Sequence, residues 1–406
     1  MQRTEGKARR NQNSILEMKG KYMTKKAGRK VFIPAGFILL SVLLNMAARF
    51  SREFSDCYVN YVFPVWVETY GRLTGLFSFS VGEKLLYLAV ILVLFLLLGG
   101  ICLLPWHLIF SKKKALVRKF RACYKKYAMF IYWVTGIVCL VMTLNCFMLY
   151  QVSPITERYQ IGEGTKESYG VEEITALRNY VVEEANRLAP LLERDEEGYL
   201  IYTGDMAKEA KAQMQRLGQE FPNLQGYYPN PKPLWLSGFF SQQYIMGYYF
   251  PFSMEANYNR QMYVVNCPTT FCHELSHLKG FILEDEANFI GYLACVDSED
   301  LFFQYSAYLS VIRYLDNDFY KAIGEDIEVY AKHPLISEQV IADKIFLTEE
   351  AWAQIEEKAV LKTEIVQQAS DTFTETTLSL NGVEDGKVSY SRVVDLLLRY
   401  YDGILY

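Results

Sequence analysis

Three long apolar segments interrupt the chain, and all three lie within its first 150 residues. They are Val31–Ala48, Leu85–Leu104 and Tyr127–Tyr150. An α-helix needs about 20 mainly apolar residues to cross the hydrocarbon core of a bilayer. Each segment is close to that length, and Leu85–Leu104 contains no charged residue. The pattern predicts three membrane-spanning helices in a membrane region, residues 31–150, which follows a basic tail of residues 1–30.

The connection between the first two apolar segments is too aromatic for an ordinary solvated loop. Within residues 51–84 it contains Tyr58–Trp66 and Phe77–Glu83. Tyrosine and tryptophan are enriched where a membrane meets water. We therefore expect either a short helix lying at that interface or an element that helps to bind a substrate.

After residue 150 the pattern becomes that of a largely helical domain. Apolar residues recur at helical spacing in the segments 171–192, 205–217, 301–316, 351–366 and 390–400. Two shorter segments, 243–248 and 262–266, have the residue types of strands. The expected fold class is α+β: three N-terminal transmembrane helices, and then one mostly helical domain, residues 151–406, with a small β-sheet.

The distribution of charge predicts an orientation in the membrane. The net charge is only -4, but basic residues cluster in residues 1–30 and again in residues 112–126, beside apolar segments. The positive-inside rule places both clusters in the cytoplasm. Three spans then put residues 151–406 on the extracytoplasmic side of a multi-pass protein of the cell membrane. Because the basic residues lie beside apolar segments, we expect a lipid bilayer as a partner and no nucleic acid.

The chemistry centres on one motif, His273-Glu274-Leu275-Ser276-His277, which contains two of the four histidines in the chain. This is an HExxH pattern. On a helix, residues i and i+4 share a face, so His273 and His277 can bind one metal ion while Glu274 stays beside it. Zinc accepts imidazole ligands and, in catalytic sites, leaves one position open for water. The motif predicts a Zn²⁺ site with Glu274 as the catalytic base.

A third protein ligand is expected in the acidic run that follows the motif. Glu284 is the first choice, and Glu286 is the alternative. Asn288 lies one helical turn after Glu284, where it can hydrogen-bond a ligand histidine. No other cofactor is expected.

Three further features are open at this stage. Cys267 and Cys272 flank the start of the motif, so they either form a disulfide or remain free, buried thiols. His333 precedes a proline in a predicted loop, and we expect no catalytic role for it. The strand segments 243–248 and 262–266 lie just before the motif, and either could pair with an extended substrate or simply belong to the core.

Four segments together resemble a known family. They are FSFSVGE (77–83), GYYFPFSMEANYN (247–259), CHELSHLKG (272–280) and EDEANFIGYLAC (284–295). The chain is similar to bacterial membrane proteins grouped as domain of unknown function 3810. More distantly, Glu284–Asn288 is similar to the segment of gluzincin-type zinc peptidases in which the first glutamate is the third zinc ligand. The resemblance implies a membrane anchor that carries a zincin-like metallopeptidase domain, and favours Glu284 over Glu286.

These observations predict a membrane-anchored, zinc-dependent metallopeptidase that hydrolyses peptide bonds of an extracytoplasmic or envelope protein. Two alternatives remain: a non-catalytic binding or signalling module that zinc only stabilises, and an amidase that acts on the cell wall. A purely structural site has no need of a free carboxylate such as Glu274, which favours the enzyme. An amidase would be expected to have a more polar cleft. No motif indicates an oligomeric state.

Overall fold

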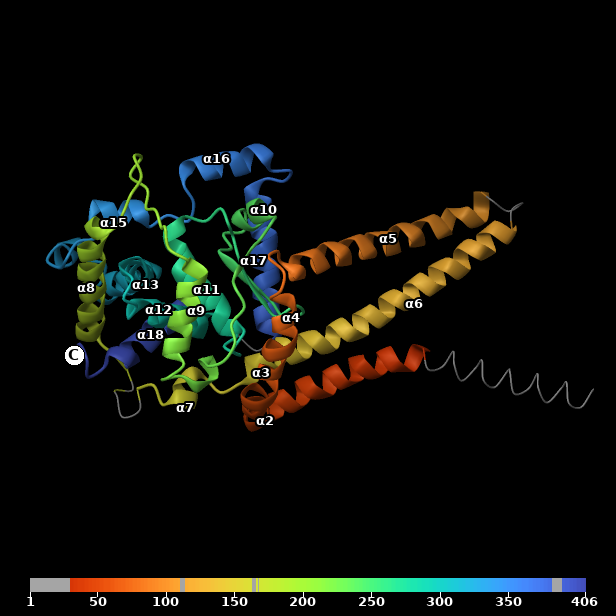
Figure 1. The fold of residues 1–406 in the computed structure, drawn as a ribbon, viewed down its shortest axis with the longest axis horizontal. Helices are drawn as coiled ribbons and strands as arrows, with labels where there is room; N and C mark the ends of the chain where they lie inside the picture. The colour runs from red at the N-terminus through yellow and green to blue at the C-terminus, as the bar shows by residue number, and fades with distance from the viewer. Residues whose placement is uncertain (1–29, 110–113, 163–165, 167, 382–388) are drawn as a thin grey trace, which may run out of the picture. The chain divides into compact units, whose positions relative to one another are not determined.

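The computed structural model describes residues 30–109, 114–162, 166, 168–381 and 389–406, so almost all of the predicted basic tail lies outside the described residues (Figure 1). The chain divides into two compact units. Unit 1 comprises Met1–Ala47 and Leu85–Leu144, and unit 2 comprises Ala48–Lys84 and Asn145–Tyr406. The connection between the first two apolar segments therefore belongs to the same unit as the HExxH motif.

Unit 1 is built from three helices that are long and apolar enough to cross a membrane. The apolar stretches run over Lys30–Phe50, Val81–Cys102 within α5 (Val81–Ile109), and Val117–Gln151, which contains most of α6 (Lys114–Asn145). Small and polar residues join them: the Asn45 amide donates a hydrogen bond of 2.9 Å to the Thr143 hydroxyl.

The prediction of three such helices is confirmed, and α5 contains the most apolar stretch of the three. Leucines such as Leu88, Leu94 and Leu97 are about half exposed, and the described protein buries no residue of the most apolar 18-residue window within Val81–Cys102. A helix that is apolar on every side is stable in lipid, where exposed leucine carries no hydration cost. The first two helices extend beyond the predicted apolar segments. The third, α6, begins before its predicted segment but ends at Asn145, ahead of a 3₁₀ turn over Phe147–Gln151.

Residues 52–74 form a continuous helix with two loosely wound turns. It consists of α2 (Arg52–Cys57), η1 (Tyr58–Val62), α3 (Phe63–Trp66), η2 (Val67–Gly71) and α4 (Arg72–Thr74), of which η1 and η2 are π-helical. The buried residues Val59, Phe63, Val67 and Gly71 recur every fourth position. An α-helix with 3.6 residues per turn would rotate such a series off one face, whereas wider π-turns keep it aligned.

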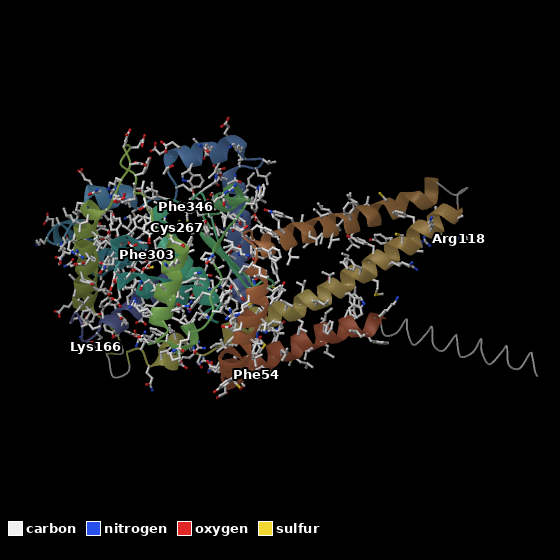
Figure 2. All side chains as sticks on the ribbon, viewed as in Figure 1. Phe54, Arg118, Lys166, Cys267, Phe303 and Phe346 are labelled. Atoms are coloured by element: carbon white, nitrogen blue, oxygen red, sulfur yellow. The ribbon has the colours of Figure 1, made fainter. Side chains whose placement is uncertain are left out.

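The helices of unit 2 lie close to where the apolar periodicity placed them. They are α7 (Ile155–Tyr159), α8 (Val171–Leu188), α9 (Met206–Leu217), α10 (Ser237–Ser241), α11 (Cys267–His277), α12 (Glu284–Val296), α13 (Leu301–Ala322), α14 (Ile327–Tyr330), α15 (Glu338–Asp343), α16 (Glu349–Lys358), α17 (Thr363–Leu380) and α18 (Ser389–Tyr401). α12 lies between α11 and α13, while α8, α9 and α18 cover this trio. The core of unit 2 contains large aromatic side chains such as Phe289 and Phe303, and Phe303 is labelled in Figure 2. The expectation of a mostly helical domain with a small sheet is confirmed.

A small sheet packs against α11. Its strands are β1 (Lys232–Pro233), β2 (Gly247–Phe250) and β3 (Glu255–Tyr258), in the order β1-β3-β2. β2 and β3 are antiparallel, with Gly247 opposite Tyr258, and β2 is an edge strand. The prediction of a strand over 262–266 is wrong: Val264–Asn266 is a 3₁₀ turn that leads into α11, because Pro268 at the start of α11 favours a helical beginning.

A buried ion pair fastens this sheet to the segment that precedes the second apolar helix. The Lys232 ammonium is paired with the Glu255 carboxylate, and both side chains are almost fully buried. Glu255 also accepts hydrogen bonds from the backbone N–H groups of Val81 and Gly82, at 3.1 and 2.6 Å. Lys232 donates a second bond to the Thr74 carbonyl, at 2.8 Å. The motif at 77–83 is therefore held in place by Glu255.

We predict that Glu255→Gln destabilises unit 2 by about 3–5 kcal/mol, because it leaves the buried Lys232 ammonium without a counter-charge. Thermal unfolding of the detergent-solubilised full chain measures the effect as a fall in Tm. Glu356→Gln, at an exposed position on α16, is the matched control and leaves Tm unchanged. Equal Tm values for the two variants would show that the pair is not needed for stability.

Candidate metal centre

The two histidines of the motif face one point from consecutive turns of α11. Their Nε2 atoms are 3.1 Å apart. The His277 side chain is buried, and the His273 side chain is 14% exposed. The i and i+4 spacing that the sequence indicated therefore brings two imidazoles together, as expected from helical geometry.

A tight turn after α11 returns the chain to the same point. Gly280 has a φ of +89°, a conformation that glycine adopts without steric cost. The Phe281 N–H bonds to the Ser276 carbonyl, and the Gly280 N–H bonds to the His277 carbonyl. These are the two hydrogen bonds of a Schellman motif, which ends a helix and reverses the chain. The turn allows α12 to begin at Glu284, only seven residues after His277.

The Glu284 carboxylate completes a triangle with the histidines. Its oxygens lie 3.1 Å from the Nε2 of His273 and 3.8 Å from the Nε2 of His277. The Glu284 side chain is 55% exposed, so this carboxylate forms the open side of the cluster. The alternative, Glu286, is turned away: it accepts bonds from the Ile155 N–H (2.7 Å) and from the Arg158 guanidinium (3.2 Å).

Hydrogen bonds from the opposite ring nitrogens orient both imidazoles. The Nδ1 of His273 lies 2.9 Å from the Asn288 side-chain oxygen, and the Nδ1 of His277 lies 2.7 Å from the Phe281 carbonyl oxygen. Both oxygens can only accept, so each Nδ1 must donate. Each neutral ring then presents an unprotonated Nε2 to the centre. When both rings are neutral, their two Nε2 atoms and the Glu284 carboxylate are three electron-pair donors facing one point, which is an arrangement suited to a cation.

Glu274 lies beside this triangle, and its carboxylate is itself within 4.8 Å of both imidazoles. One of its oxygens is 4.0 Å from the Nε2 of His273, and the other, Oε2, is buried without any hydrogen-bond partner in the described structure. A side chain on Gly247 of β2 would collide with the Glu274 carboxylate. The absence of a side chain at 247 is therefore what lets β2 pass directly over Glu274.

Charge and burial shift the pKa values of all four groups. Burial alone lowers the pKa of His273, but the hydrogen bond and charge of Glu284 outweigh it and raise the value to about 9. Burial and the neighbouring His273 lower the pKa of His277 to about 4. Burial raises the pKa of Glu274 to about 8. Burial also acts to raise the pKa of Glu284, yet the two histidines hold it at about 2. Without a metal, a proton on His273 takes the place of the cation.

One aromatic residue on β2 also lies within electrostatic range of the cluster. Tyr248 contacts Phe240 of α10, with ring centroids 6.0 Å apart, and its side chain is partly exposed. Burial of the hydroxyl raises the pKa of Tyr248, and the charges of Glu274 and Glu284 raise it further. Tyr248 thus adds a neutral hydroxyl group near the two carboxylates.

Several positions that shape this site were not identified from the sequence. Gly247 gives β2 its path over Glu274, the Phe281 carbonyl orients His277, and Gly291 on α12 brings the two helices together. A side chain on Gly291 would come within 3.0 Å of the Thr269 carbonyl. A glycine inside a helix lowers the stability of that helix. The presence of Gly291 in the helical segment was therefore the signal in the sequence that α12 packs closely against a neighbouring helix.

Of the two alternatives for Cys267 and Cys272, the structure has free thiols. The Cys272 sulfur lies 3.7 Å from that of Cys295 on α12 instead. Successive turns of α11 direct residues 267 and 272 differently, so their separation along the chain does not bring them together. His333 bonds to Asn179 and packs against Phe319.

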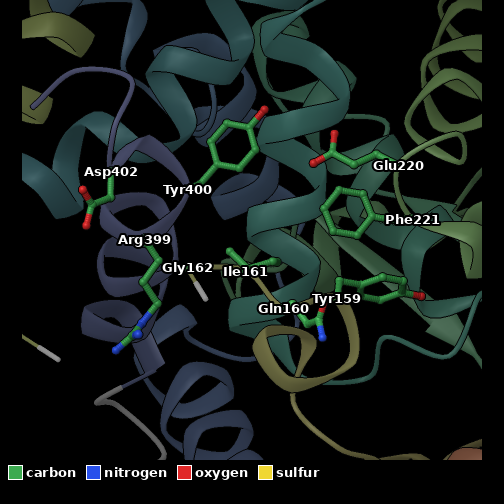
Figure 3. A pocket seen from close by; sticks show the side chains of 9 residues that line it. All are labelled: Tyr159, Gln160, Ile161, Gly162, Glu220, Phe221, Arg399, Tyr400 and Asp402. Atoms are coloured by element: carbon green, nitrogen blue, oxygen red, sulfur yellow. The ribbon is translucent and has the colours of Figure 1, made fainter. Parts of the chain in front are cut away.

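A separate pocket of about 330 Å³ includes none of the cluster residues (Figure 3). It is lined by Tyr159, Gln160, Ile161, Gly162, Glu220, Phe221, Arg399, Tyr400 and Asp402. Its charged groups have partners within the chain: Arg399 bonds to Asp395 at 2.8 Å, and Asp402 accepts a bond from Tyr169 at 3.1 Å. We assign it no chemistry.

Fold and site together define a class: a mostly helical protein with three helices able to span a membrane and a His/Glu cluster on two packed helices. The chain belongs to the family described as "Protein of unknown function (DUF3810)", whose model matches residues 58–398. This match confirms the family resemblance. No curated protein and no solved structure matches the chain.

We predict that Glu284→Gln lowers the pKa of His273 in the metal-free protein from about 9 to below the ordinary histidine value. The amide has no charge to stabilise the imidazolium, so burial then dominates. Histidine NMR signals of the full chain in micelles, followed against pH, measure the shift.

Glu286→Gln is the control for this titration, because Glu286 does not contact either histidine. It leaves the pKa of His273 near 9. An equal pKa for His273 in both variants would mean that Glu284 does not hold the imidazolium.

Proposed function

We propose that this protein is a membrane-anchored, zinc-dependent metallopeptidase. In this proposal His273, His277 and Glu284 bind the metal, Asn288 orients His273, and Glu274 is the catalytic acid and base. Unit 2 faces the extracytoplasmic side, because the basic segments 1–30 and 112–126 favour the cytoplasm. The substrate is a peptide segment of an envelope protein.

The donor set and its spacing fit Zn²⁺. Two ligand atoms at zinc distances of ~2.1 Å and a tetrahedral angle are about 3.4 Å apart. The three separations in the cluster, 3.1, 3.1 and 3.8 Å, lie on either side of this value. The exposed side of Glu284 leaves room for a further ligand. Zinc, when bound, would polarise a water molecule and the carbonyl group of a substrate.

Glu274 is suited to moving a proton. Its Oε2 has no hydrogen-bond partner among the described residues, and burial raises its pKa to about 8, so the carboxyl group can accept or release a proton close to neutral pH. The group takes a proton from the attacking water and later passes it to the leaving amine. A site that only stabilised a fold would leave no reason to bury an unpaired carboxylate here, since such burial costs free energy. This unpaired oxygen is the observation that carries the proposal.

The free edge of β2 supports a peptide as the substrate. An extended chain can add to an exposed strand edge through backbone hydrogen bonds, and pockets beside alternate side chains then select the sequence. β2 is the edge strand of the sheet and passes over Glu274 at Gly247. A peptide bound along β2 would therefore present a backbone carbonyl close to the cluster. The aromatic side chains of Tyr248, within β2, and Phe240, which contacts it, favour this substrate over polar cell-wall material.

We predict that the full chain, purified in detergent, retains about one zinc per molecule, and that Glu284→Gln loses it. Glu274→Gln keeps the zinc but abolishes hydrolysis of a quenched-fluorescent peptide library, because only the proton carrier is removed. Metal analysis and the fluorescence assay are run on the same preparations. Glu286→Gln, the control, keeps both zinc and activity if it folds, which its Tm reports. Metal-loaded wild type without hydrolysis would favour the non-catalytic module.

We also predict that Gly247→Ala lowers kcat by about 100-fold or more without loss of zinc, because the added methyl group displaces Glu274. Gly238→Ala is the matched control: a Cβ at 238 meets only ordinary contacts, the nearest at 3.5 Å, and leaves kcat unchanged. A Gly247→Ala variant with wild-type kcat would show that β2 does not position the carboxylate.

A further inference from the structure

Six large apolar side chains are exposed on one part of unit 2. We call them the apolar rim: Phe77, Phe79, Trp235, Phe239, Val360 and Leu361. Trp235 is 66% exposed and Val360 is 96% exposed, although both belong to ordered parts of the chain. Large exposed apolar patches on proteins mark surfaces that contact another molecule or a membrane.

Hydrogen bonds join α10 to the other exposed segments of the rim. The carboxylate of Glu83, in the first turn of α5, accepts the backbone N–H groups of Trp235 and Leu236 at 3.0 and 2.8 Å. At the other end of α10, the Gln242 amide donates to the Leu361 carbonyl at 2.9 Å. Phe77 and Phe79 lie a few residues before Glu83 and contact each other, with ring centroids 5.3 Å apart.

The hydrogen bonds to Glu83 hold the rim beside the first turn of α5, and so close to the point where that helix would enter a membrane. Glu83 and Lys84 begin the apolar stretch Val81–Cys102, which contains no other charged residue. A helix that enters a bilayer keeps its charged first turn at the water interface. The Lys84 ammonium also lies 4.5 Å above the Trp235 ring. Trp235 is therefore held within about one helical turn, ~5 Å, of the membrane boundary.

We propose that the apolar rim inserts into the interfacial layer of the bilayer and holds unit 2 down on the membrane surface. Its composition suits this place, because tryptophan and phenylalanine beside lysine are favoured at the interface. Phe240, the neighbour of Phe239 on α10, points inward instead and packs with Leu234 and Phe250. α10 thus has a core side and a lipid side.

The rim also determines which peptides reach the cluster, a step that rests on the proposed peptidase function. Phe240 of α10 contacts Tyr248 of β2, and β2 passes over Glu274 one residue earlier, at Gly247. The cluster is therefore separated from the rim by one pair of aromatic rings, Phe240 and Tyr248. A rim in the bilayer holds the β2 edge next to the lipid headgroups. The substrate class is a peptide segment adjacent to a membrane anchor, such as the stem of a lipid-anchored or membrane-spanning protein.

Photo-crosslinking tests the insertion directly. The full chain is placed in nanodiscs of phosphatidylcholine that carries a diazirine on the acyl chain, and labelled peptides are identified by mass spectrometry. We expect lipid adducts on segments 76–79, 235–239 and 360–365 as well as on α5, and none around Ile327 or Leu335, which are equally exposed on unit 2. Adducts confined to the apolar helices would overturn the proposal and indicate that a protein partner covers the rim.

A double variant tests whether the rim side chains cause the insertion. Trp235→Gln with Phe239→Gln preserves the backbone bonds to Glu83 and removes adducts from 235–239. Ile327→Gln with Leu335→Gln is the matched control and leaves labelling unchanged. Because all four side chains are exposed, both variants should retain the Tm of the wild type. Undiminished labelling of 235–239 in the first variant would contradict a role for its side chains.

Tethered peptides test the substrate class. A quenched-fluorescent library is attached to a palmitoyl chain through spacers of ~4, ~12 and ~24 residues, about 13 to 80 Å when extended, in vesicles that contain the zinc-loaded protein. We expect the shortest spacer to be cut at least as fast as the longest, and the Trp235/Phe239 variant to lose about tenfold on the short spacer only. Cleavage of the longest spacer alone would overturn the substrate class.

A failure of the proposed membrane surface can be distinguished from a failure of the proposed peptidase function. Lipid adducts on the rim without cleavage of any library would leave the membrane surface in place and refute the peptidase. Cleavage of an untethered library by the wild type, without adducts on the rim, would support the peptidase and refute the surface.

Discussion

The left-handed turn at Gly280 is the constraint on which the candidate site depends. It ends α11 directly after His277 and reverses the chain within six residues, so α12 must run back along α11. The reversal places Glu284 opposite the two imidazoles and Asn288 beside His273. The same turn supplies the Phe281 carbonyl to His277. A residue with a Cβ at 280 would be strained and would also collide with Val59, so the turn connects the site to the helix of residues 52–74.

A second constraint connects the sheet to the apolar helices. Two glutamates make hydrogen bonds in exchange between these segments. Glu255 on β3 accepts hydrogen bonds from backbone N–H groups at the start of α5, and Glu83 at the start of α5 accepts hydrogen bonds from backbone N–H groups just before α10. Both carboxylates are buried, and buried carboxylates are costly unless hydrogen-bonded. Their reciprocal bonds thus fix β3, the partner of the strand that passes over Glu274, to the point where the chain enters its apolar stretch.

The sequence was most informative where a function or a fold depends on local spacing. The four-residue spacing of His273 and His277, the acidic start of α12 and the three apolar segments could all be recognised, because each is a property of one helix. Contacts between segments that are distant in the sequence could not be recognised in this way. Gly247 over Glu274, Gly291 against Thr269, and Cys272 beside Cys295 depend on how helices and strands pack. The strand predicted at 262–266 failed for the same reason: Val264 and Val265 are apolar because they are close to the core, not because they pair in a sheet.

The helix of residues 52–74 links two of the apolar segments in the sequence and also contacts the candidate site. Its ends continue into two apolar helices, and its buried stripe packs against Gly280 and Met254 of the domain. The side opposite this stripe exposes Tyr61, Val65 and Leu73. Because its inner side contacts the Gly280 turn, the helix of residues 52–74 packs directly against the segment that joins α11 to α12. A change in this connecting helix would therefore be felt first at the turn that sets Glu284 opposite the two imidazoles.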